Sequence, residues 1–435
     1  MKLIQTLKNI WKIEDLRKRL TITFLFILIY RFGCQVVLPG INPNELQKLA
    51  DFTNKTGLMQ LLDMFSGGAF SQASIFALGI MPYITASIVI QLLGMVLPSF
   101  QKMQREGESG RMKLNQYTRY LTVVILIVQG LAYILNLQYQ VGVSFNAWQL
   151  AFLTIVLSAG GMFIMWLGEK ITDKGIGNGI SLIIFVGIIA RFPGAISQEF
   201  TGRLTSAQGG LVMFLVEIVV LFAVTAGAVM LTQGTRKVPV QYAKRIVGNK
   251  QYGGARQYIP LKVNAANVMP IIFAQALMFI PLTFAQFSQD GSGFASAFVD
   301  MNGFWYNLVY FLLIVAFTYF YTAITVRPTQ MAEEMKKNSG FIPGIKPGKK
   351  TAEYLDSIMS RITLPGSIFL GIVAIMPAFA RLLGVNQHFA QFFGGTSLLI
   401  SVGVVLDTLQ QIETHLRMHH YDGLMKSGKI KGRAS

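Results

Sequence analysis

The hydrophobic pattern of the chain is a series of long apolar stretches separated by polar ones. Ten of these stretches approach or exceed the roughly 20 residues that an α-helix needs to cross a bilayer. Their limits are Leu20–Val37, Phe76–Leu97, Tyr117–Leu137, Trp148–Gly168, Ile176–Ala190, Leu211–Leu231, Val263–Phe284, Phe304–Val326, Ile362–Leu383 and Phe389–Leu409. We therefore predict ten membrane-spanning helices, of which the fifth is short and rich in glycine.

One region is too long to be a single span. The 37 residues from Met64 to Phe100 carry no charge, and as one helix they would be roughly 55 Å long, against a hydrocarbon core of roughly 30 Å. Helix-breaking residues also interrupt the region, namely Gly67, Gly68, Gly79 and Pro82. We predict a short, loosely apolar segment at about residues 57–70, followed by a full span. Irregular backbone at membrane depth persists only where protein buries it or where it lines a cavity.

Composition agrees with a polytopic membrane protein. Of the 435 residues, 52% are apolar and 13% are charged, and the mean hydropathy is +0.49. A soluble chain of this length would carry about twice that share of charged residues. Cys34 is the single cysteine, so no intrachain disulfide is possible.

The net charge of +18 raises the question of nucleic-acid binding, but its distribution favours another explanation. The N-terminus, the alternate loops after spans 2, 4, 6 and 8, and the tail hold 32 of the 38 Lys and Arg residues, when Arg119 at the start of span 3 is counted with its loop. The opposite loops hold five, with Arg381 at the end of span 9 among them, and Arg31 lies inside span 1. This asymmetry is the positive-inside pattern, and it predicts that both termini are cytoplasmic and that the number of spans is even.

The spans divide into two groups of five. We expect an N-terminal half over residues 1–197, a polar outward connector over 198–210, a C-terminal half over 211–412 and a cytoplasmic tail over 413–435. Halves with an odd number of spans insert in opposite orientations. Inverted repeats of this kind form channels and transporters whose pathway lies between the halves.

Two cytoplasmic loops are longer than topology alone requires. Gln233–Lys262 holds seven basic residues and no acidic one, and Arg327–Arg361 holds seven basic and four acidic residues. Long ordered loops are usually functional, so we expect these two to contact a partner. The alternative is that their charge serves only to orient the helices.

Motifs along nearly the whole chain, in matching order, resemble the SecY family of protein-conducting channels, above all its bacterial form. They are Phe65–Ile84, Gly107–Arg111, Trp166–Thr172, Gly175–Ser181, Ile259–Asn264, Met269–Phe273, Phe341–Ile345 and Gly394–Ile400. The resemblance implies an all-α membrane protein with ten helices in two inverted halves around a central pore. It also implies that unfolded secretory polypeptides cross through the pore and that hydrophobic segments leave it sideways into the membrane.

Four isoleucines fit a narrow apolar constriction. Ile80 and Ile84 are four residues apart on one helix face, and so are Ile184 and Ile188. From the residues alone, such side chains face lipid or a neighbouring helix. The resemblance implies a pore ring of Ile80, Ile84, Ile184, Ile188, Ile272 and Ile400. A ring of this kind excludes water and closes around an extended chain without selecting its sequence.

The resemblance also implies that the segment at 57–70 is a plug for the pore, and we call it the plug segment. Its residues at the heart of the matching motif are Phe65, Ser66, Gly67 and Gly68. Glycines permit the unusual backbone geometry that such a segment needs. The alternative is a re-entrant element that packs in place and never moves.

A lateral gate between spans 2 and 7 is a further implication of the resemblance. Thr85, Gln129 and Asn264 would form its polar seam. Interhelical polar contacts in bilayers are worth about 0.6 kcal/mol, so a seam of three would hold closed and still part for an apolar helix. Alternatively, these side chains bond within their own helices.

The same resemblance names partners. Lys244, Arg245, Lys250 and Arg256 would contact the motor SecA or the ribosome, because a basic loop suits an acidic protein surface or RNA phosphates. Thr329 occupies a position that is often basic in relatives. SecE and SecG would be the small membrane subunits, and the substrates would be preproteins with signal sequences. The location would be a bacterial cytoplasmic membrane, in contact with its lipid.

Catalytic motifs are missing from the sequence. It has no complete phosphate-binding loop, dinucleotide fingerprint or metal-ligand cluster, so we expect no cofactor, no metal and no enzymatic activity of its own. His415, His419 and His420 fit a solvated helix face better than a metal site. A partner would therefore supply the energy for movement.

Two other functions share some of these features. A secondary transporter would also have ten spans in inverted halves, but it would need several buried carboxylates or a broken-helix site. The ionisable residues in or at the edges of spans are Arg31, Glu217 and Asp407, which are too sparse for a proton relay. A nucleic-acid-binding membrane anchor would explain the basic loops but not the uncharged, broken region.

Overall fold

The computed structural model describes residues 13–41, 63–141, 145–205, 210–242, 245–247, 250–252, 256–266, 268–275, 277–278 and 303–426. The chain divides into two compact units. The first comprises Met1–Gly194 together with Val404–Ser435, and the second comprises Ala195–Gly403. Their boundaries fall inside two long helices, α9 (Gly179–Thr205) and α17 (Gly395–Lys426).

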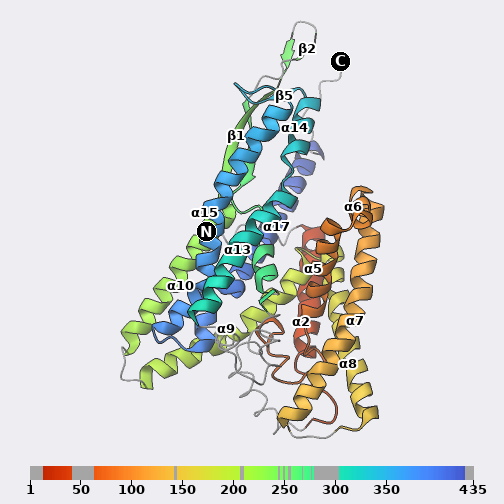
Figure 1. Cartoon of the computed structure of the whole chain (residues 1–435), viewed down its shortest axis with the longest axis vertical. Coiled ribbons are helices and arrows are strands. Elements are labelled where there is room, and N and C mark those ends of the chain that lie inside the picture. Colours follow the sequence, from red (N-terminus) through yellow and green to blue (C-terminus); the bar gives the residue numbers. More distant parts are fainter. Residues whose placement is uncertain are drawn as a thin grey trace. The chain divides into compact units, whose positions relative to one another are not determined.

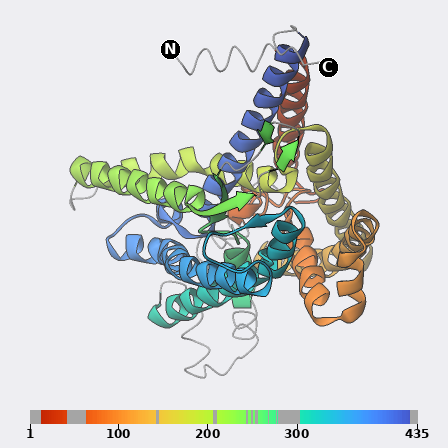
Figure 2. The same cartoon turned by 90° about the horizontal axis from the view of Figure 1, so that it is seen from above.

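The first unit is built of helices. In chain order they are α2 (Glu14–Gly33), α5 (Met81–Val96), α6 (Pro98–Arg105), α7 (Glu108–Val141) and α8 (Ala147–Lys174), joined by the first part of α9 and the last part of α17. Helix α5 packs against α7, α7 packs against α8, and α8 packs against α2. Figure 2 shows the orange helices α5, α6 and α7 gathered on one side of this unit.

Local sequence explains where several of these helices begin. Proline stands in the first turn of both α5 and α6, where its missing N–H costs no hydrogen bond. Leu97 alone separates the two helices, and the chain bends by 103° between Met81–Gly94 and Pro98–Gln104. At the start of α8, Gln149 Oε1 accepts a hydrogen bond from the Asn146 backbone N–H at 3.0 Å, which is half of a capping box.

The second unit holds α10 (Gly210–Gln233), α13 (Phe304–Thr325), α14 (Pro328–Lys337), α15 (Lys349–Leu382), the short α16 (Gln387–Ala390) and a 3₁₀ turn over Gln391–Phe393. Helix α13 packs along α15 (Figure 1). Its buried positions recur every fourth residue: Tyr306, Tyr310, Ile314, Thr318 and Thr322. This spacing places them on one face of the helix.

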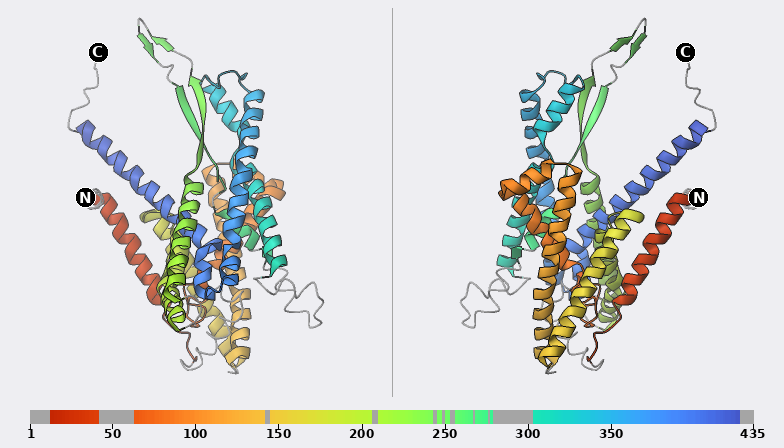
Figure 3. Two further views of the ribbon diagram at one scale, coloured as in Figure 1. Left: turned by 90° about the vertical axis from the view of Figure 1, so that its left-hand side faces the viewer. Right: turned by 90° about the vertical axis from the view of Figure 1, so that its right-hand side faces the viewer.

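The two long loops that are predicted to be cytoplasmic form one folded body. Strand β1 (Thr235–Tyr242) pairs antiparallel with β4 (Arg256–Lys262) on one side and with β5 (Gly340–Phe341) on the other. The short strands β2 (Arg245–Val247) and β3 (Lys250–Tyr252) form a separate hairpin at the tip of the β1–β4 ribbon (Figure 3). Residues from the sheet, α14 and α15 share a core of Val238, Val240, Leu261, Met335, Ile342, Leu355 and Met359.

Within the described residues, seven helices are long and apolar enough to cross a membrane, or eight if α5 and α6 count as one bent span. These eight coincide with predicted spans 2 to 6 and 8 to 10. Predicted span 1 is helix α2, whose first turns are charged and which carries Arg31 near its end. Predicted span 7 lies partly outside the described residues, and its described part includes a helical stretch at 269–275.

Several helices differ in length from the predicted spans. Helix α9 continues through Pro193 to Thr205, so the first part of the predicted connector is helical. Helix α15 begins at Lys349, inside the predicted loop, and α17 continues to Lys426, inside the predicted tail. Hydropathy marks only the lipid-immersed part of a helix, and these extensions are polar.

Candidate functional site

The described part of the plug segment, residues 63–70, is buried along its whole length. Residues 63–65 form a helical turn, and turns continue from there to Ile80. Residues 57–62 of the predicted segment lie outside the described residues. Phe65 and Ser66 are 4% and 2% exposed. The predicted interruption of the apolar region is thus present, in the form of buried irregular backbone.

Two glycines give the plug segment its path. Gly67 has φ +65° and Gly68 has φ +94°, values in the left-handed region that other residues rarely adopt. A Cβ atom at Gly67 would lie 2.8 Å from the Cα of Gly187, which is on α9. The lack of side chains at Gly67 and Gly187 therefore lets two backbones meet directly.

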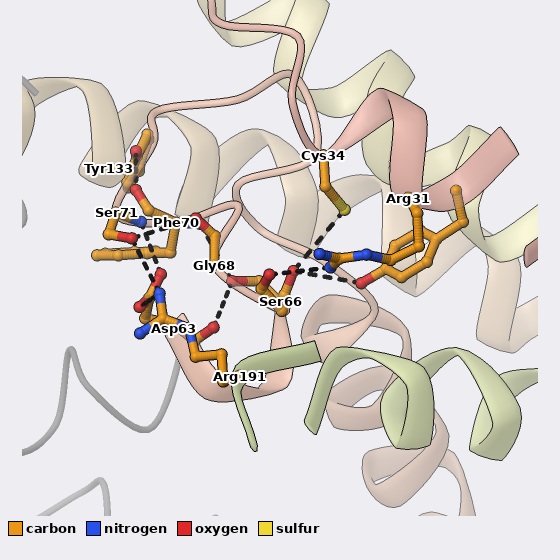
Figure 4. A network of polar contacts seen from close by, with 11 residues as sticks. Arg31, Cys34, Asp63, Ser66, Gly68, Phe70, Ser71, Tyr133 and Arg191 are labelled. Carbon is orange, nitrogen blue, oxygen red and sulfur yellow. Dashed lines mark hydrogen bonds and ion pairs between the residues drawn. The ribbon is translucent and has the colours of Figure 1, made fainter. Parts of the chain in front are cut away.

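Helix α2 holds the middle of the plug segment through three side chains that point at two carbonyl oxygens (Figure 4). The Tyr30 hydroxyl donates a hydrogen bond to Ser66 O at 3.3 Å, and the Cys34 thiol donates to the same oxygen at 3.9 Å. Arg31 Nη1 donates to Gly67 O at 3.0 Å. These bonds satisfy carbonyls that no regular secondary structure would satisfy, as buried backbone requires.

Asp63 is the first described residue of the plug segment and is fully buried. Its carboxylate forms an ion pair with Arg191 of α9 and accepts a hydrogen bond from the Ser71 backbone N–H at 2.7 Å. Arg191 also donates to Ser71 Oγ at 3.0 Å. A buried carboxylate is tolerated only when it is paired and hydrogen-bonded, so Arg191 is what allows Asp63 to be buried.

Helix α7 supports the far end of the plug segment. The Tyr133 hydroxyl donates a hydrogen bond to Phe70 O at 2.9 Å, and the rings of Phe70 and Tyr133 meet edge-on with centroids 4.8 Å apart. The two rings belong to a buried cluster with Leu38, Ala73, Ala77, Ile134, Leu137, Leu153 and Leu157. Three helices of the first unit therefore contact the plug segment.

The predicted pore-ring residues are distributed over both units. Ile80 directly precedes α5 and is 2% exposed, and Ile84, on α5, is half-buried. Ile184 and Ile188 of α9 are 4% and 1% exposed. The other two members belong to the second unit, where Ile272 is half-buried and Ile400 is buried. A closed ring of all six stays a prediction.

The structure describes the three predicted gate residues separately, each within its own unit. The Thr85 hydroxyl donates a hydrogen bond to Met81 O of its own helix at 3.0 Å. Gln129 is half-buried on α7, and Asn264 is 6% exposed in the turn after β4. Asn264 belongs to the second unit, so a seam between these residues stays a prediction.

The predicted contact residues lie on the β-ribbon. Arg245 is on β2, Lys250 on β3 and Arg256 at the start of β4, whereas Lys244 lies outside the described residues. Sequence reasoning treated this region only as a loop. In β1, buried Val238 and Val240 alternate with exposed residues over only a few positions. Basic residues around them obscure this strand pattern in the sequence.

A second buried polar network, which sequence reasoning missed, lies in the second unit. Arg203 Nε donates to Glu199 Oε1 at 2.8 Å, and Nη2 donates to Glu217 Oε1 at 2.5 Å and to Gly384 O at 2.8 Å. Glu199 Oε2 accepts a hydrogen bond from the Asn386 backbone N–H at 2.9 Å. The network ties the end of α9 to α10 and to the loop after α15.

Arg191 and Asp63 were also missed as functional residues. Arg191 contributed only to the charge count of an outward loop, although it directly follows the apolar stretch Ile176–Ala190. Asp63 stands immediately before the uncharged region. A charge at each edge of an apolar region was the available signal, but nothing in the sequence paired the two. The other flagged ionisable residue, Asp407, accepts a hydrogen bond from Gln411 within α17 at 3.5 Å.

Known proteins are similar to this chain over almost its full length. A family model described as SecY matches residues 74–409. The protein translocase subunit SecY of Streptomyces griseus is 45% identical over 434 residues, which are 96% of this chain and 98% of that protein.

Two solved structures share the fold. One is a SecY protein whose plug domain stabilises the closed state of the translocation channel and maintains a membrane seal, with a TM-score of 0.61 and 18% identity. The other is Sec61 in the canine ribosome–channel complex from the endoplasmic reticulum, with a TM-score of 0.54 and 17% identity. Each alignment covers 92% of this chain and 92% of the other. The predicted all-α membrane fold is thereby confirmed, and ten spans are consistent with it.

Proposed function

This chain belongs to the SecY family, and we propose that it forms the channel through which unfolded secretory polypeptides cross a bacterial cytoplasmic membrane. The channel is passive. It releases hydrophobic segments sideways into lipid and draws its driving force from a partner. Both termini are on the cytoplasmic side, as the distribution of Lys and Arg indicates.

The observation that carries the proposal is the buried plug segment. Its contacts with α2, α7 and α9 are hydrogen bonds to carbonyls, one ion pair and glycine contacts, together with the buried side chains of Met64, Phe65 and Phe70. Water can replace the hydrogen bonds of a segment that moves into an aqueous space, which reduces the net cost of losing them. Residues 63–70 are therefore suited to fill a channel at rest and to leave it when a polypeptide enters.

The ring and the gate complete the proposed channel. Ile80, Ile84, Ile184, Ile188, Ile272 and Ile400 form the constriction, which dewets when it is empty and fits around an extended chain when it is filled. Thr85, Gln129 and Asn264 form the polar seam of the gate, through which hydrophobic signal sequences reach the lipid. Thr85 has a bond within its own helix, so the seam costs little to part.

We place the partners on the cytoplasmic body formed by the sheet, α14 and α15. SecA or the ribosome contacts Arg245 on β2, Lys250 on β3 and Arg256 at the start of β4. Lys244, which lies outside the described residues, belongs to the same proposed contact. The canine Sec61 that shares this fold was solved in a ribosome–channel complex. SecE and SecG are the small membrane subunits of the same assembly.

The test is to crosslink a polypeptide arrested during translocation to single cysteines in a Cys34→Ser background. Ile188→Cys places a thiol at the constriction, and Ile189→Cys on the same helix is the matched control, since Ile188 is 1% exposed and Ile189 is 46% exposed. We expect adducts at position 188 and far fewer at position 189. Equal yields at both positions, or none at either, would sink the proposal.

A further inference from the structure

One face of α9 carries both predicted ring residues and plug contacts. Ile184, Gly187, Ile188 and Arg191 are separated by three, one and three residues, which places all four on the same side of the helix. Gly187 touches the plug segment by its backbone, and Arg191 holds Asp63. The face that presents two members of the constriction is therefore also the face on which the plug segment rests.

Two glycines lie against the plug segment at separate places, and each directly precedes a predicted ring isoleucine. On α9, a Cβ at Gly187 would lie 3.0 Å from Phe65 O and 3.2 Å from Gly67 N. Before α5, a Cβ at Gly79 would lie 3.4 Å from the Cα of Ser66. Gly187 directly precedes Ile188, and Gly79 directly precedes Ile80. A displacement of the backbone at either isoleucine therefore moves the adjacent glycine that bounds the plug segment.

The Asp63–Arg191 ion pair differs in kind from the other contacts. Asp63 is 0% exposed, and Arg191 is 26% exposed at the rim of the site. Separating the pair strands a buried carboxylate, which is unfavourable until the carboxylate reaches water. The contact from Arg31 is a hydrogen bond to a carbonyl, and α2 carries none of the predicted ring residues.

We propose that α9 couples the two closures of the channel, so that the ring and the plug open in one step, with the Asp63–Arg191 ion pair as the lock. The inference rests on the proposed function, because it takes Ile184 and Ile188 as pore-lining. Arg191 acts here as a positioning residue: it sets how readily the plug segment leaves. By reciprocity, whatever spreads the ring weakens the lock, and whatever breaks the lock favours an open ring.

The labelling rate of Cys34, the native cysteine, measures how firmly the ion pair holds the plug segment in place. Cys34 is 1% exposed and lies against Ser66 O, so the plug segment shields its thiol while seated. The full chain, co-purified with its partner subunits and reconstituted in lipid vesicles, is treated with a membrane-impermeant maleimide. Asp63→Asn and Arg191→Gln are expected to raise the Cys34 labelling rate by roughly tenfold or more, because each removes one charge of the buried ion pair and leaves the other without its counter-charge.

Three further variants keep this readout interpretable. The double charge reversal Asp63→Arg with Arg191→Asp is expected to return labelling towards the parent rate. Arg119→Gln is the matched control, because Arg119 pairs with Glu169 in the same unit but far from the plug contacts in sequence and at an exposed site. It is expected to leave Cys34 protected. Ser71→Ala removes one hydrogen bond from Arg191 and tests the lock without creating a buried charge.

The coupling between the plug segment and the ring is tested by labelling a residue of the proposed ring. Ile184→Cys in a Cys34→Ser background is labelled in the same set of lock variants, and halide efflux from the vesicles is recorded in parallel. We expect labelling at position 184 and efflux to rise together with labelling at Cys34 in the matching variants. If Cys34 becomes reactive while position 184 stays protected and efflux is unchanged, the two closures are independent and the coupling is refuted.

The remaining outcomes are also decisive. Unchanged Cys34 labelling in Asp63→Asn, Arg191→Gln and Ser71→Ala alike refutes the lock. Failure of the proposed function shows elsewhere, as the absence of arrested-chain adducts at position 188 in the parent channel. The two failures are therefore distinguishable.

Discussion

Arg203 donates a hydrogen bond to Glu217 Oε1 across 2.5 Å, and both side chains are at least nine-tenths buried. The same guanidinium also donates to Glu199, so one cation is shared between two carboxylates. Glu217 Oε2 has no hydrogen-bond partner among the described residues. Glu217 is therefore part of a structural network that joins α9 and α10, and this contact accounts for an ionisable residue within a predicted span.

Removing the cation from this network is expected to be costly. Arg203→Ala leaves two buried carboxylates facing each other, and we expect it to lower the free energy of unfolding by about 3–5 kcal/mol. Thermal unfolding in mild detergent measures the effect. Arg119→Ala breaks an exposed pair and is expected to cost about 0–1 kcal/mol. Similar midpoints for the two variants would contradict a structural role for the network.

Gly187→Ala tests the backbone contact between α9 and the plug segment. The added methyl group would lie 3.0 Å from Phe65 O, tighter than nine in ten real contacts, so the plug segment would have to give by a few tenths of an ångström. We expect a larger resting halide leak and faster maleimide labelling of Cys34, with little change in helix content. Gly194→Ala on the same helix meets no atom within 4 Å and should leave both quantities unchanged. An equal leak in the two variants would show that the contact does not seat the plug segment.

Tyr133→Phe separates the hydrogen bond from the ring packing at Phe70. It removes the donor to Phe70 O and keeps the edge-on contact, so we expect about 1 kcal/mol less stability for the seated plug segment. The expected readout is Cys34 labelling that is faster by roughly fivefold, the factor that corresponds to this free energy. Tyr139→Phe on the same helix is the control, since Tyr139 is 87% exposed. No difference between the two variants would mean that the aromatic packing alone holds Phe70.

Charge reversal at the tip of the β-ribbon tests the proposed partner surface. Arg245→Glu combined with Lys250→Glu changes the charge on β2 and β3, outside the shared core of the sheet, α14 and α15. We expect weaker, less salt-dependent binding of SecA or of ribosomes to the reconstituted channel, measured by co-sedimentation over a salt series. The thermal midpoint should not move. Undiminished binding of both partners would place their contacts elsewhere.

A substitution in the core that the sheet, α14 and α15 share tests whether the two long loops fold together. Leu355→Ala on α15 removes a fully buried side chain from the shared core, and we expect a loss of about 2–5 kcal/mol in the stability of that body. Limited proteolysis is expected to cleave both of the long loops, at 233–262 and 327–361, faster, because one core holds them together. Cleavage that accelerates in only one loop would show that they fold separately.

Some features of this protein could be predicted from residues near one another in the chain. The apolar stretches located eight spans that the structure describes as helices, and the uncharged but broken region predicted buried irregular backbone at Gly67 and Gly68. The motifs from Phe65 to Ile400 predicted the family, which the match to its family model confirmed. Hydropathy underestimated the lengths of α9 and α15, because the ends of these helices are polar yet remain helical.

The sequence by itself determined the class of protein, the approximate spans and the glycines that free the backbone, because hydropathy, charge bias and backbone freedom are properties of single residues and short windows. Only the tertiary structure decided that Asp63 meets Arg191, that Gly187 admits the backbone at Gly67, and that the two long polar loops share one core. These contacts join residues that are distant in the chain. Which buried charges pair, and which backbones meet without side chains between them, depends on which helices pack together. A local sequence pattern does not determine that packing.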